Sequence, residues 1–277
     1  MGDIILGVDI GGSHITTALV DVQQRALVPG SLQRIHVDAQ ADAADILDSW
    51  TAVMQQTVGN AGNIQHIGIA MPGPFDYESG ISLIRGLHKY ESLYGLNVKE
   101  LLADRLHLPP SAITFANDAA CFLQGELFAG VARGEQHALG LTLGTGFGSA
   151  IARDGVVQEG DFWKAPFLDT IAEEYISTRW FLRRYEALTG QKIASVKTLA
   201  ALVPTSADAR SVFEEFGGHL STFLSQQADL PKLVVLGGNI SQSYGLFQHT
   251  LQQHLPDTRF VVSQLGEDAI LIGACTY

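Results

Sequence analysis

Asp9-Ile10-Gly11-Gly12-Ser13 and Gly144-Thr145-Gly146-Phe147-Gly148-Ser149 are glycine turns at corresponding places in the two halves of this chain. Apolar residues flank each turn, at 4–8 and 15–20 around the first and at 139–143 and 150–151 around the second. A glycine turn with an apolar run on each side predicts a β-hairpin. The same hairpin at the start of both halves indicates a duplicated architecture.

Both turns are candidate phosphate sites. Glycine has no Cβ and tolerates positive φ, so its backbone N–H groups can approach an anion closely. A glycine-rich hairpin is also often only a tight turn, and this alternative stays open for either turn alone. Asp9 opens the first turn, where its carboxylate could hold a divalent metal ion through water against a phosphate. Neither the P-loop pattern nor the Rossmann pattern occurs in the sequence, so those sites are not expected.

The composition bounds the class of protein. A chain of 277 residues that is 46% hydrophobic and 17% charged can bury a large core, and its length predicts two domains or a duplicated one. The net charge of −12 argues against nucleic-acid and acidic-membrane partners. Cys121 and Cys275 show no metal-ligand spacing, and neither a cationic signal segment nor a membrane-spanning apolar run is evident, so a cytoplasmic protein is expected.

Helical and strand patterns alternate along both halves, which predicts an α/β fold with mixed sheets flanked by helices. Without a linker to mark a boundary, the repeat divides the chain into domains 1–116 and 117–277. Besides the hairpins, strands are expected at 31–37, 67–70, 112–116, 233–236 and 259–262, and helices at 41–58, 98–106, 118–128, 168–188, 196–202, 207–227 and from 268.

The chain resembles the sugar-kinase branch of the ROK family, within the actin-like ATPase superfamily, over nearly its whole length. The motifs that carry the resemblance, in the family's order and spacing, are residues 7–13, 70–74, 117–120, 143–148 and 235–240. The resemblance implies two actin-like (ribonuclease H-like) domains with ATP and a sugar in an interdomain active-site cleft. It also allows the terminal helix, about residues 268–277, to pack back on the first domain.

Asp118 is the candidate catalytic base. It follows a strand at the start of a helix, where active-site loops of α/β sheets lie, although an aspartate there is also a favoured helix N-cap. The resemblance makes Asn117 and Asp118 the catalytic pair. Asn117 would hydrogen-bond sugar hydroxyls, and Asp118 would accept the proton of the attacking hydroxyl, which a carboxylate can do without a raised pKa. Gly73, in the loop 70–74, is a further substrate-binding candidate.

The resemblance assigns the nucleotide to both turns and to a third glycine pair. Backbone N–H groups of Gly11, Gly12 and Ser13, and of Gly144, Thr145 and Gly146, would face the β- and γ-phosphates, with Mg²⁺ held near Asp9, through water. The pair Gly237-Gly238 resembles the family's adenosine motif, against the alternative of a plain turn between strand and helix. Cationic side chains are scarce in the turns: His14 stands where many relatives carry lysine, and it is expected to be a structural strand residue.

The sugar half departs from the family. Where ROK kinases carry a cysteine-rich zinc motif, this chain passes directly from Glu159 to Glu173 and Ser177 without a cysteine, so zinc is not expected. Glu173 matches the family's second sugar-binding glutamate and Glu159 is the candidate for the first. The segment 85–90 matches the family's sugar loop poorly, and His88, Lys89 and Tyr90 are expected to face solvent rather than substrate.

The sequence thus predicts an ATP- and Mg²⁺-dependent hexose kinase, with glucose as the default substrate. Kinases for an N-acetylhexosamine, mannose or fructose stay open, as do a catalytically silent sugar or nucleotide sensor and an actin-like ATPase without a sugar substrate. The expected partners are a small sugar and ATP, and the resemblance also allows a homodimer.

Overall fold

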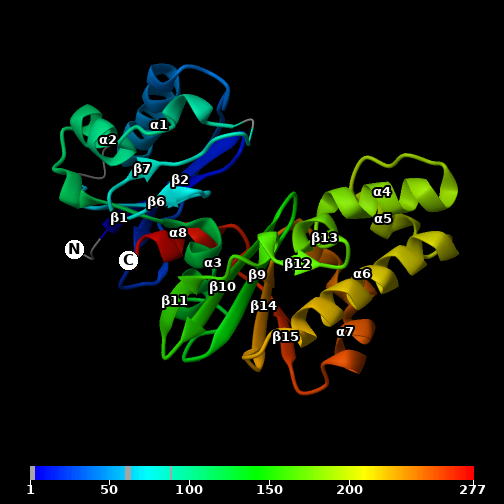
Figure 1. Cartoon of the computed structure of the whole chain (residues 1–277). Coiled ribbons are helices and arrows are strands. Elements are labelled where there is room, and N and C mark those ends of the chain that lie inside the picture. The colour runs from blue at the N-terminus through cyan, green and yellow to red at the C-terminus, as the bar shows by residue number, and fades with distance from the viewer. Residues whose placement is uncertain (1–3, 60–63, 88) are drawn as a thin grey trace. The chain divides into compact units, whose positions relative to one another are not determined.

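The computed structural model describes residues 4–59, 64–87 and 89–277 (Figure 1). Contacts within the chain divide it into two compact units. The first comprises Met1–Gly130 together with Glu267–Tyr277, and the second comprises Val131–Gly266. None of the described helices has the length and apolar character that crossing a membrane requires.

The first unit is built on a mixed sheet. Strands β1 and β2 form the predicted antiparallel hairpin, and β1 continues into the parallel strands β5 and β8, so the sheet order is β3-β2-β1-β5-β8, with β4 paired to β2. The strands are β1 (Ile4–Ile10), β2 (His14–Asp21), β3 (Ala26–Leu27), β4 (Gln33–His36), β5 (Ile67–Met71) and β8 (Ile113–Asn117).

Helices cover both faces of this sheet. Alternate residues of β1 point to opposite faces: Leu6 and Val8 join the buried cluster around Trp50 of α1, whereas Gly7 faces Leu271 of α8. The helices are α1 (Ala43–Val58), α2 (Val98–Leu106), α3 (Asp118–Phe128) and α8 (Asp268–Ala274), joined by short elements β6 (Phe75–Asp76), β7 (Ile81–Ser82), η1 (Glu91–Leu93) and η2 (Pro110–Ala112).

The C-terminal helix α8 belongs to the first unit and packs against β1, β5 and α3 (red in Figure 1). Two glycines permit its close approach to α3, since a Cβ on Gly125 would overlap the carbonyl oxygen of Ala269 and one on Gly273 would overlap that of Cys121. This packing ties α3 to the first unit. The contacts therefore divide the chain after Gly130, whereas the repeat pattern alone placed the boundary after residue 116.

The sheet of the second unit repeats the order of the first. Its hairpin β9–β10 continues into the parallel strands β14 and β15, which gives β11-β10-β9-β14-β15. The arrangement β10-β9-β14-β15 corresponds to β2-β1-β5-β8, as the duplicated hairpins predicted. The strands are β9 (Ala138–Leu143), β10 (Phe147–Arg153), β11 (Val156–Glu159), β14 (Leu233–Gly237) and β15 (Arg259–Val262).

The helices of the second unit pack around buried aromatic rings, including Phe181, Phe213 and Phe216. The expected helix over 168–188 is too long, because Leu168 has φ 51° and residues 166–171 form a small hairpin before the helix starts at Thr178. The elements are η3 (Phe162–Lys164), β12 (Pro166–Phe167), β13 (Thr170–Ile171), η4 (Ala172–Glu174), α4 (Thr178–Thr189), α5 (Val196–Leu202), α6 (Ala207–Ser225), η5 (Asn239–Leu246) and α7 (Gln248–His254).

Candidate functional site

The first glycine turn joins β1 to β2 as a tight hairpin. The backbone N–H of Gly11 donates to the carbonyl of His14 at 2.8 Å, which closes the turn. Gly12 and Ser13 are exposed at its tip, and within the described part of the chain their N–H groups donate no backbone hydrogen bond. Free N–H groups at an exposed glycine tip are suited to an anion such as a phosphate.

Asp9 and Asp118 stand at the same edge of the first sheet. Asp9 is the second-last residue of β1 and pairs with Ala70 of β5, and β5 is paired in parallel with β8, which leads directly into Asp118. Burial raises the pKa of Asp9 to about 7, and the negative charges of Asp118 and Glu267 add to this effect while Arg34 opposes it. The two carboxylates are therefore close enough to repel one another.

Asp118 is a half-buried residue at the first position of α3. Burial raises its pKa, although a hydrogen bond from the N–H of Ala119 to Oδ1, at 2.8 Å, and the positive charge of Lys89 oppose the rise. The sequence required no raised pKa for a base here, and the structure differs because the side chain is withdrawn from water. A raised pKa brings a carboxylate base closer to neutral pH.

Asn117, and not Asp118, is the N-cap of α3. Its Oδ1 accepts hydrogen bonds from the N–H groups of Ala119 and Ala120, at 2.9 and 3.2 Å. The N-cap interpretation of Asp118 is thus wrong, since the capping oxygen comes from the preceding residue. The Nδ2 of Asn117 donates to the hydroxyl of Tyr77 at 3.2 Å. A Cβ on Gly73 would lie 3.3 Å from that hydroxyl, so the structure brings Gly73 and Asn117 together around Tyr77.

The segment before η1 also reaches the first turn, which the sequence did not predict. Tyr90 is fully buried and its hydroxyl donates to the carbonyl of Gly11 at 2.6 Å, so the expectation that Tyr90 faces solvent is wrong. Lys89, directly before it, lies beside Gly12. His88 falls outside the described residues. The contact joins residues far apart in the sequence, and no local pattern could have indicated it.

The second glycine turn, in the second unit, is held from several sides. The carbonyl of Gly144 accepts the N–H of Thr178, at the start of α4, at 2.8 Å. The N–H of Phe147 donates to Oε2 of Glu173 at 3.0 Å. A Cβ on Gly144 would meet no atom within 4 Å. Space is therefore open beside Gly144, and the absence of a side chain there is not explained by packing within the described protein.

The structure separates the roles of the two candidate sugar-binding glutamates. Glu173 lies in η4 against the second turn, and its other oxygen, Oε1, accepts a hydrogen bond from Arg179 at 2.9 Å. Glu159 lies at the exposed end of the edge strand β11, opposite Ala150 of β10. Glu173 is thus part of the turn's surroundings, whereas Glu159 is a surface residue of the strand.

The third glycine pair lies close to the second turn. Gly237 ends β14, and Gly238 has φ 79°, a conformation that favours glycine. A Cβ on Gly238 would overlap the backbone of Leu143, the last residue of β9 before the second turn. The structure therefore brings together, within one unit, the glycines that the sequence assigned to the phosphates and to adenosine.

An aromatic cluster in the second unit surrounds His219. The rings of Phe167, Tyr175 and Trp180 meet its imidazole edge to face, with centroids 5.0–6.1 Å away. Its Nδ1 is buried without a hydrogen-bond partner in the described protein, and burial lowers the pKa of His219. The imidazole of His219 is therefore packed among aromatic rings in a setting that favours its neutral form. The expected lack of zinc stays a prediction.

The donor set fits a hydrated magnesium ion better than an enclosed metal site. Among the described residues, no group of three or more His, Cys, Asp or Glu side chains could hold a metal. Asp9 and Asp118, however, are hard oxygen donors with raised pKa values, and a nearby cation would relieve their repulsion. Mg²⁺ commonly keeps several waters and binds through one or two carboxylates and substrate phosphates.

Comparison with known proteins gives a consistent result. Residues 5–166 match the ROK family. N-acetylgalactosamine kinase AgaK of Shewanella sp. (strain ANA-3) is 26% identical over 85% of this chain and 82% of its own. The glucokinase of Thermotoga maritima is 24% identical over 98% and 96%. A ROK family glucokinase from Streptomyces griseus, solved with glucose and AMPPNP, superimposes with a TM-score of 0.76 at 20% identity, covering 98% of this chain and 97% of that one.

The matched segment holds the first turn, the pair Asn117-Asp118 and the second turn. The first turn and Asn117-Asp118 follow strands of the sheet in the first unit, and the second turn joins β9 to β10 in the second unit. The family match spans more than half of the chain, and the fold similarity spans nearly all of it. This chain belongs to the ROK family.

Proposed function

We propose that this protein is an ATP- and Mg²⁺-dependent sugar kinase, which transfers the γ-phosphoryl group of ATP to a hydroxyl of a hexose. The observation that carries the proposal is the position of Asp118. It is a half-buried carboxyl with a raised pKa at the start of α3, at the same sheet edge as Asp9 and the first glycine turn. A base beside a phosphate-binding turn is what transfer to an alcohol requires.

The side chains around Asp118 suggest how the acceptor is activated. Asp118 takes the proton from the attacking hydroxyl as the new oxygen–phosphorus bond forms, and its raised pKa favours that transfer near neutral pH. Asn117 keeps the start of α3 in place through its cap, and its amide lies beside Gly73 and Tyr77, where we place the sugar. Bound ATP with Mg²⁺ supplies the phosphoryl group and the charge that holds it, with Asp9 contacting the ion through water.

Backbone N–H groups of the glycine turns bind phosphate in this proposal. The exposed N–H groups of Gly12 and Ser13 are available to phosphate oxygens. In the second unit the N–H groups of Thr145 and Gly146 offer the same chemistry beside the open space at Gly144, whose own N–H donates to the carbonyl of Gly146 at 3.1 Å. Gly237 and Gly238, next to that turn, take the adenosine. Preorganised backbone N–H groups stabilise charge that develops on a phosphoryl group during transfer.

The sugar is a hexose or a hexose derivative. Glucose remains our default, and an N-acetylhexosamine is supported equally by the relatives, which include an N-acetylgalactosamine kinase and a glucokinase. Mannose and fructose are further candidates. We assign Glu173 and Glu159 to sugar hydroxyls, because a carboxylate can accept hydrogen bonds from two adjacent hydroxyls. Cys121 and Cys275 are buried and free, which suits the cytoplasm.

The test is ADP release coupled to a colour change, measured with Mg-ATP across a panel of hexoses, N-acetylhexosamines and fructose. We expect sugar-dependent turnover, and for Asp118→Asn a fall in kcat of roughly 10²–10⁴-fold, the usual contribution of a general base. Asp104→Asn, which removes an exposed carboxylate of α2, is the control and should keep full activity. ADP release without any sugar would instead indicate an ATPase, and sugar or nucleotide binding without turnover would indicate a sensor.

A further inference from the structure

The first glycine turn has a cationic neighbour that lies far from it in the sequence. A Cβ on Gly12 would lie 3.9 Å from Cδ of Lys89, so the aliphatic stem of Lys89 runs along the exposed tip of the turn. Lys89 itself is only partly exposed. A lysine stem commonly lies on a surface while its ammonium group remains free for a polar partner.

Lys89 is held at the turn by the residue that follows it. The backbone N–H of Tyr90 donates to the carbonyl of Ala39 at 2.7 Å, and its hydroxyl donates to the carbonyl of Gly11 at 2.6 Å. Its ring packs edge to face on Trp50, 5.2 Å between centroids. These contacts fix both the backbone and the side chain of a fully buried residue. The position of Lys89 beside Gly12 therefore follows from packing.

The charge of Lys89 acts toward Asp118. Its ammonium group lowers the pKa of the Asp118 carboxyl, in opposition to burial. Lys89 forms no ion pair with a carboxylate of the described residues. The ammonium is thus attracted to the base without being neutralised by it, and the stem that carries it lies on the phosphate turn.

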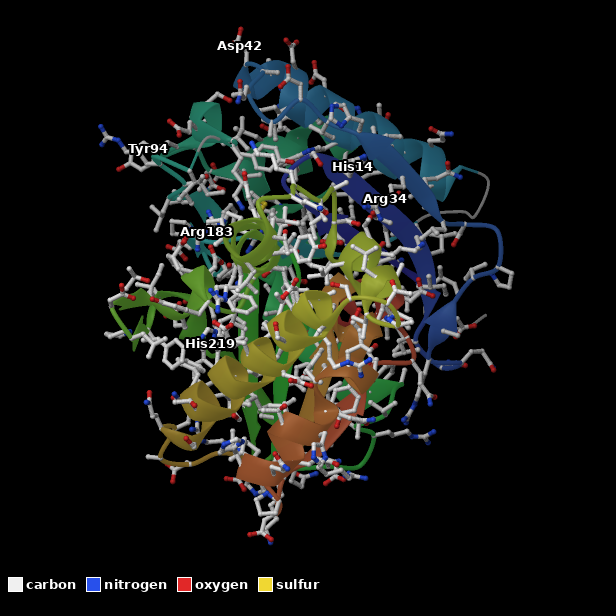
Figure 2. The ribbon with its side chains drawn as sticks, turned by 90° about the vertical axis from the view of Figure 1, so that its right-hand side faces the viewer. His14, Arg34, Asp42, Tyr94, Arg183 and His219 are labelled. Carbon is white, nitrogen blue, oxygen red and sulfur yellow. The ribbon has the colours of Figure 1, made fainter. Side chains whose placement is uncertain are left out.

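The other basic side chains near this edge have partners of their own. Arg34 of β4 forms an ion pair with Glu267. His14 of β2 shares a hydrogen bond with Ser13 Oγ, and its ring meets that of His36. Figure 2 shows His14 and Arg34 on these neighbouring strands. Lys89 supplies the unpaired positive charge that the sequence motif of the turn lacks.

We propose that the ammonium group of Lys89 contacts the phosphoryl group during its transfer and neutralises part of its charge. The inference rests on the proposed kinase function. In the step, the sugar oxygen forms a bond to phosphorus, its proton goes to Asp118, and the bond to the β-phosphate oxygen breaks with its electron pair left on ADP. Lys89 keeps its proton throughout and contributes only charge, as cationic clamps do in phosphoryl transfer.

The test compares Lys89→Met, Lys89→Arg and a matched control, Lys99→Met. Lys99 belongs to α2 of the same unit and donates to the carbonyl of Glu78, so its loss removes the same charge elsewhere. We expect Lys89→Met to lower kcat by roughly 10²-fold with the KM for the sugar changed less than about 3-fold. Lys89→Arg should recover part of kcat, since it retains the charge. Lys99→Met should behave as the unmodified protein, and melting temperatures verify that all variants fold.

A binding measurement isolates the proposed contact from turnover. With sugar and Mg²⁺ present, ADP with aluminium fluoride mimics the phosphoryl group in flight, whereas ADP alone does not. Lys89→Met should weaken binding of the analogue by about 100-fold, equivalent to about 2.7 kcal/mol, and leave ADP binding unchanged.

The outcomes separate this inference from the proposed function. If the unmodified protein phosphorylates a sugar and Lys89→Met keeps the kcat of Lys99→Met, the inference is wrong and the kinase proposal stands. A raised KM for the sugar at constant kcat would also overturn it, because it would place Lys89 on the sugar. If the unmodified protein transfers no phosphate, the kinase proposal fails. In that case, equal binding of the ADP–aluminium fluoride analogue to Lys89→Met and Lys99→Met would also reject the contact between Lys89 and the phosphoryl group.

Discussion

Glu173 accepts the backbone N–H of Phe147 at 3.0 Å and so ties η4 to the second glycine turn. The carboxylate also fills the space beside Gly146, where a Cβ would lie 2.8 Å from its Oε2. Its second oxygen, Oε1, accepts a hydrogen bond from Nη2 of Arg179 at 2.9 Å. The sequence assigned Glu173 only to the sugar. In the structure Glu173 also holds the second glycine turn, which the sequence assigned to the nucleotide.

Replacement of Glu173 should consequently affect the nucleotide as well as the sugar. Glu173→Ala removes a charged acceptor from the N–H of Phe147, and such hydrogen bonds contribute about 1.5–3 kcal/mol. We expect the KM for ATP to rise by about 10-fold or more, along with the KM for the sugar, in steady-state kinetics with each substrate varied.

Glu174→Ala is the matched control. Glu174 follows in the same turn and pairs with Arg179 and Arg183, at 3.1 and 2.8 Å, and among the described residues it forms no hydrogen bond with the glycine turn. Its removal should leave the KM for ATP unchanged. A rise confined to the KM for the sugar in Glu173→Ala would show that the contact with Phe147 does not hold the turn.

The hydroxyl of Tyr90 should matter for the first turn in the same way. Tyr90→Phe deletes the bond to the carbonyl of Gly11 and leaves a buried site without its donor, which costs about 1–3 kcal/mol. We expect a lower melting temperature and a raised KM for ATP, because the turn and Lys89 lose their anchor.

Tyr94→Phe controls for the loss of a phenol in the same segment. Tyr94 is 50% exposed, with Arg85 stacked on its ring, so the exchange should change neither stability nor kinetics. Equal melting temperatures for Tyr90→Phe and Tyr94→Phe would contradict the structural role of the buried hydroxyl.

Local sequence patterns predicted the frame of the site. The hairpins around Gly11 and Gly144 follow from apolar alternation and turn glycines, and the position of Asp118 follows from a strand that runs directly into a helix. Each of these signals is contained in a few consecutive residues. The duplicated strand order of the two sheets could be predicted for the same reason.

The parts that escaped prediction depend on contacts between distant segments. Tyr90 meets Gly11, and Lys89 meets Gly12, only after the chain has folded back on itself. Single-sequence periodicity reports which face of an element is apolar and not which loop it meets, so these side chains were assigned to solvent. The helix expected from residue 168 failed for a local reason, the small hairpin that precedes Thr178.

The pH dependence of stability should reveal the titration of Asp9, which is half-buried. Its pKa is about 7 in the folded protein against an ordinary 3.8, because of burial, Asp118 and Glu267. A raised pKa means that the folded state binds the proton more tightly, so this contribution to stability is complete below about pH 4 and is lost as the pH rises through about 7. The loss amounts to roughly 4 kcal/mol, at about 1.4 kcal/mol per pKa unit.

Urea unfolding at several pH values measures this effect. Asp9→Asn should flatten the decline in the free energy of unfolding between pH 4 and 7. Asp104→Asn, which removes an exposed carboxylate, should retain that decline. Mg²⁺ with ADP should also reduce the decline in the unmodified protein, because a cation near Asp9 favours its charged form. An unchanged slope in Asp9→Asn would show that another group titrates in this range.

The close packing of α8 on α3 gives a last prediction, with a control built into the chain. In Gly273→Ala the new methyl group would overlap the carbonyl oxygen of Cys121, so α8 must move away from α3. Overpacking of this kind typically costs 1–3 kcal/mol, about the range we expect in urea unfolding. Gly218→Ala makes the same exchange in α6, where a Cβ meets nothing within 4 Å, and should stabilise the protein by about 0.5–1 kcal/mol through helix propensity alone.

The two variants should also differ in activity. Asp118 is the first residue of α3, so a displaced α8 shifts the base that we propose, and kcat should fall in Gly273→Ala at temperatures where the protein remains folded. Gly218→Ala should keep its kcat. If Gly273→Ala were as stable and as active as Gly218→Ala, the helices could separate without cost, and the position of Asp118 would not depend on the C-terminal helix.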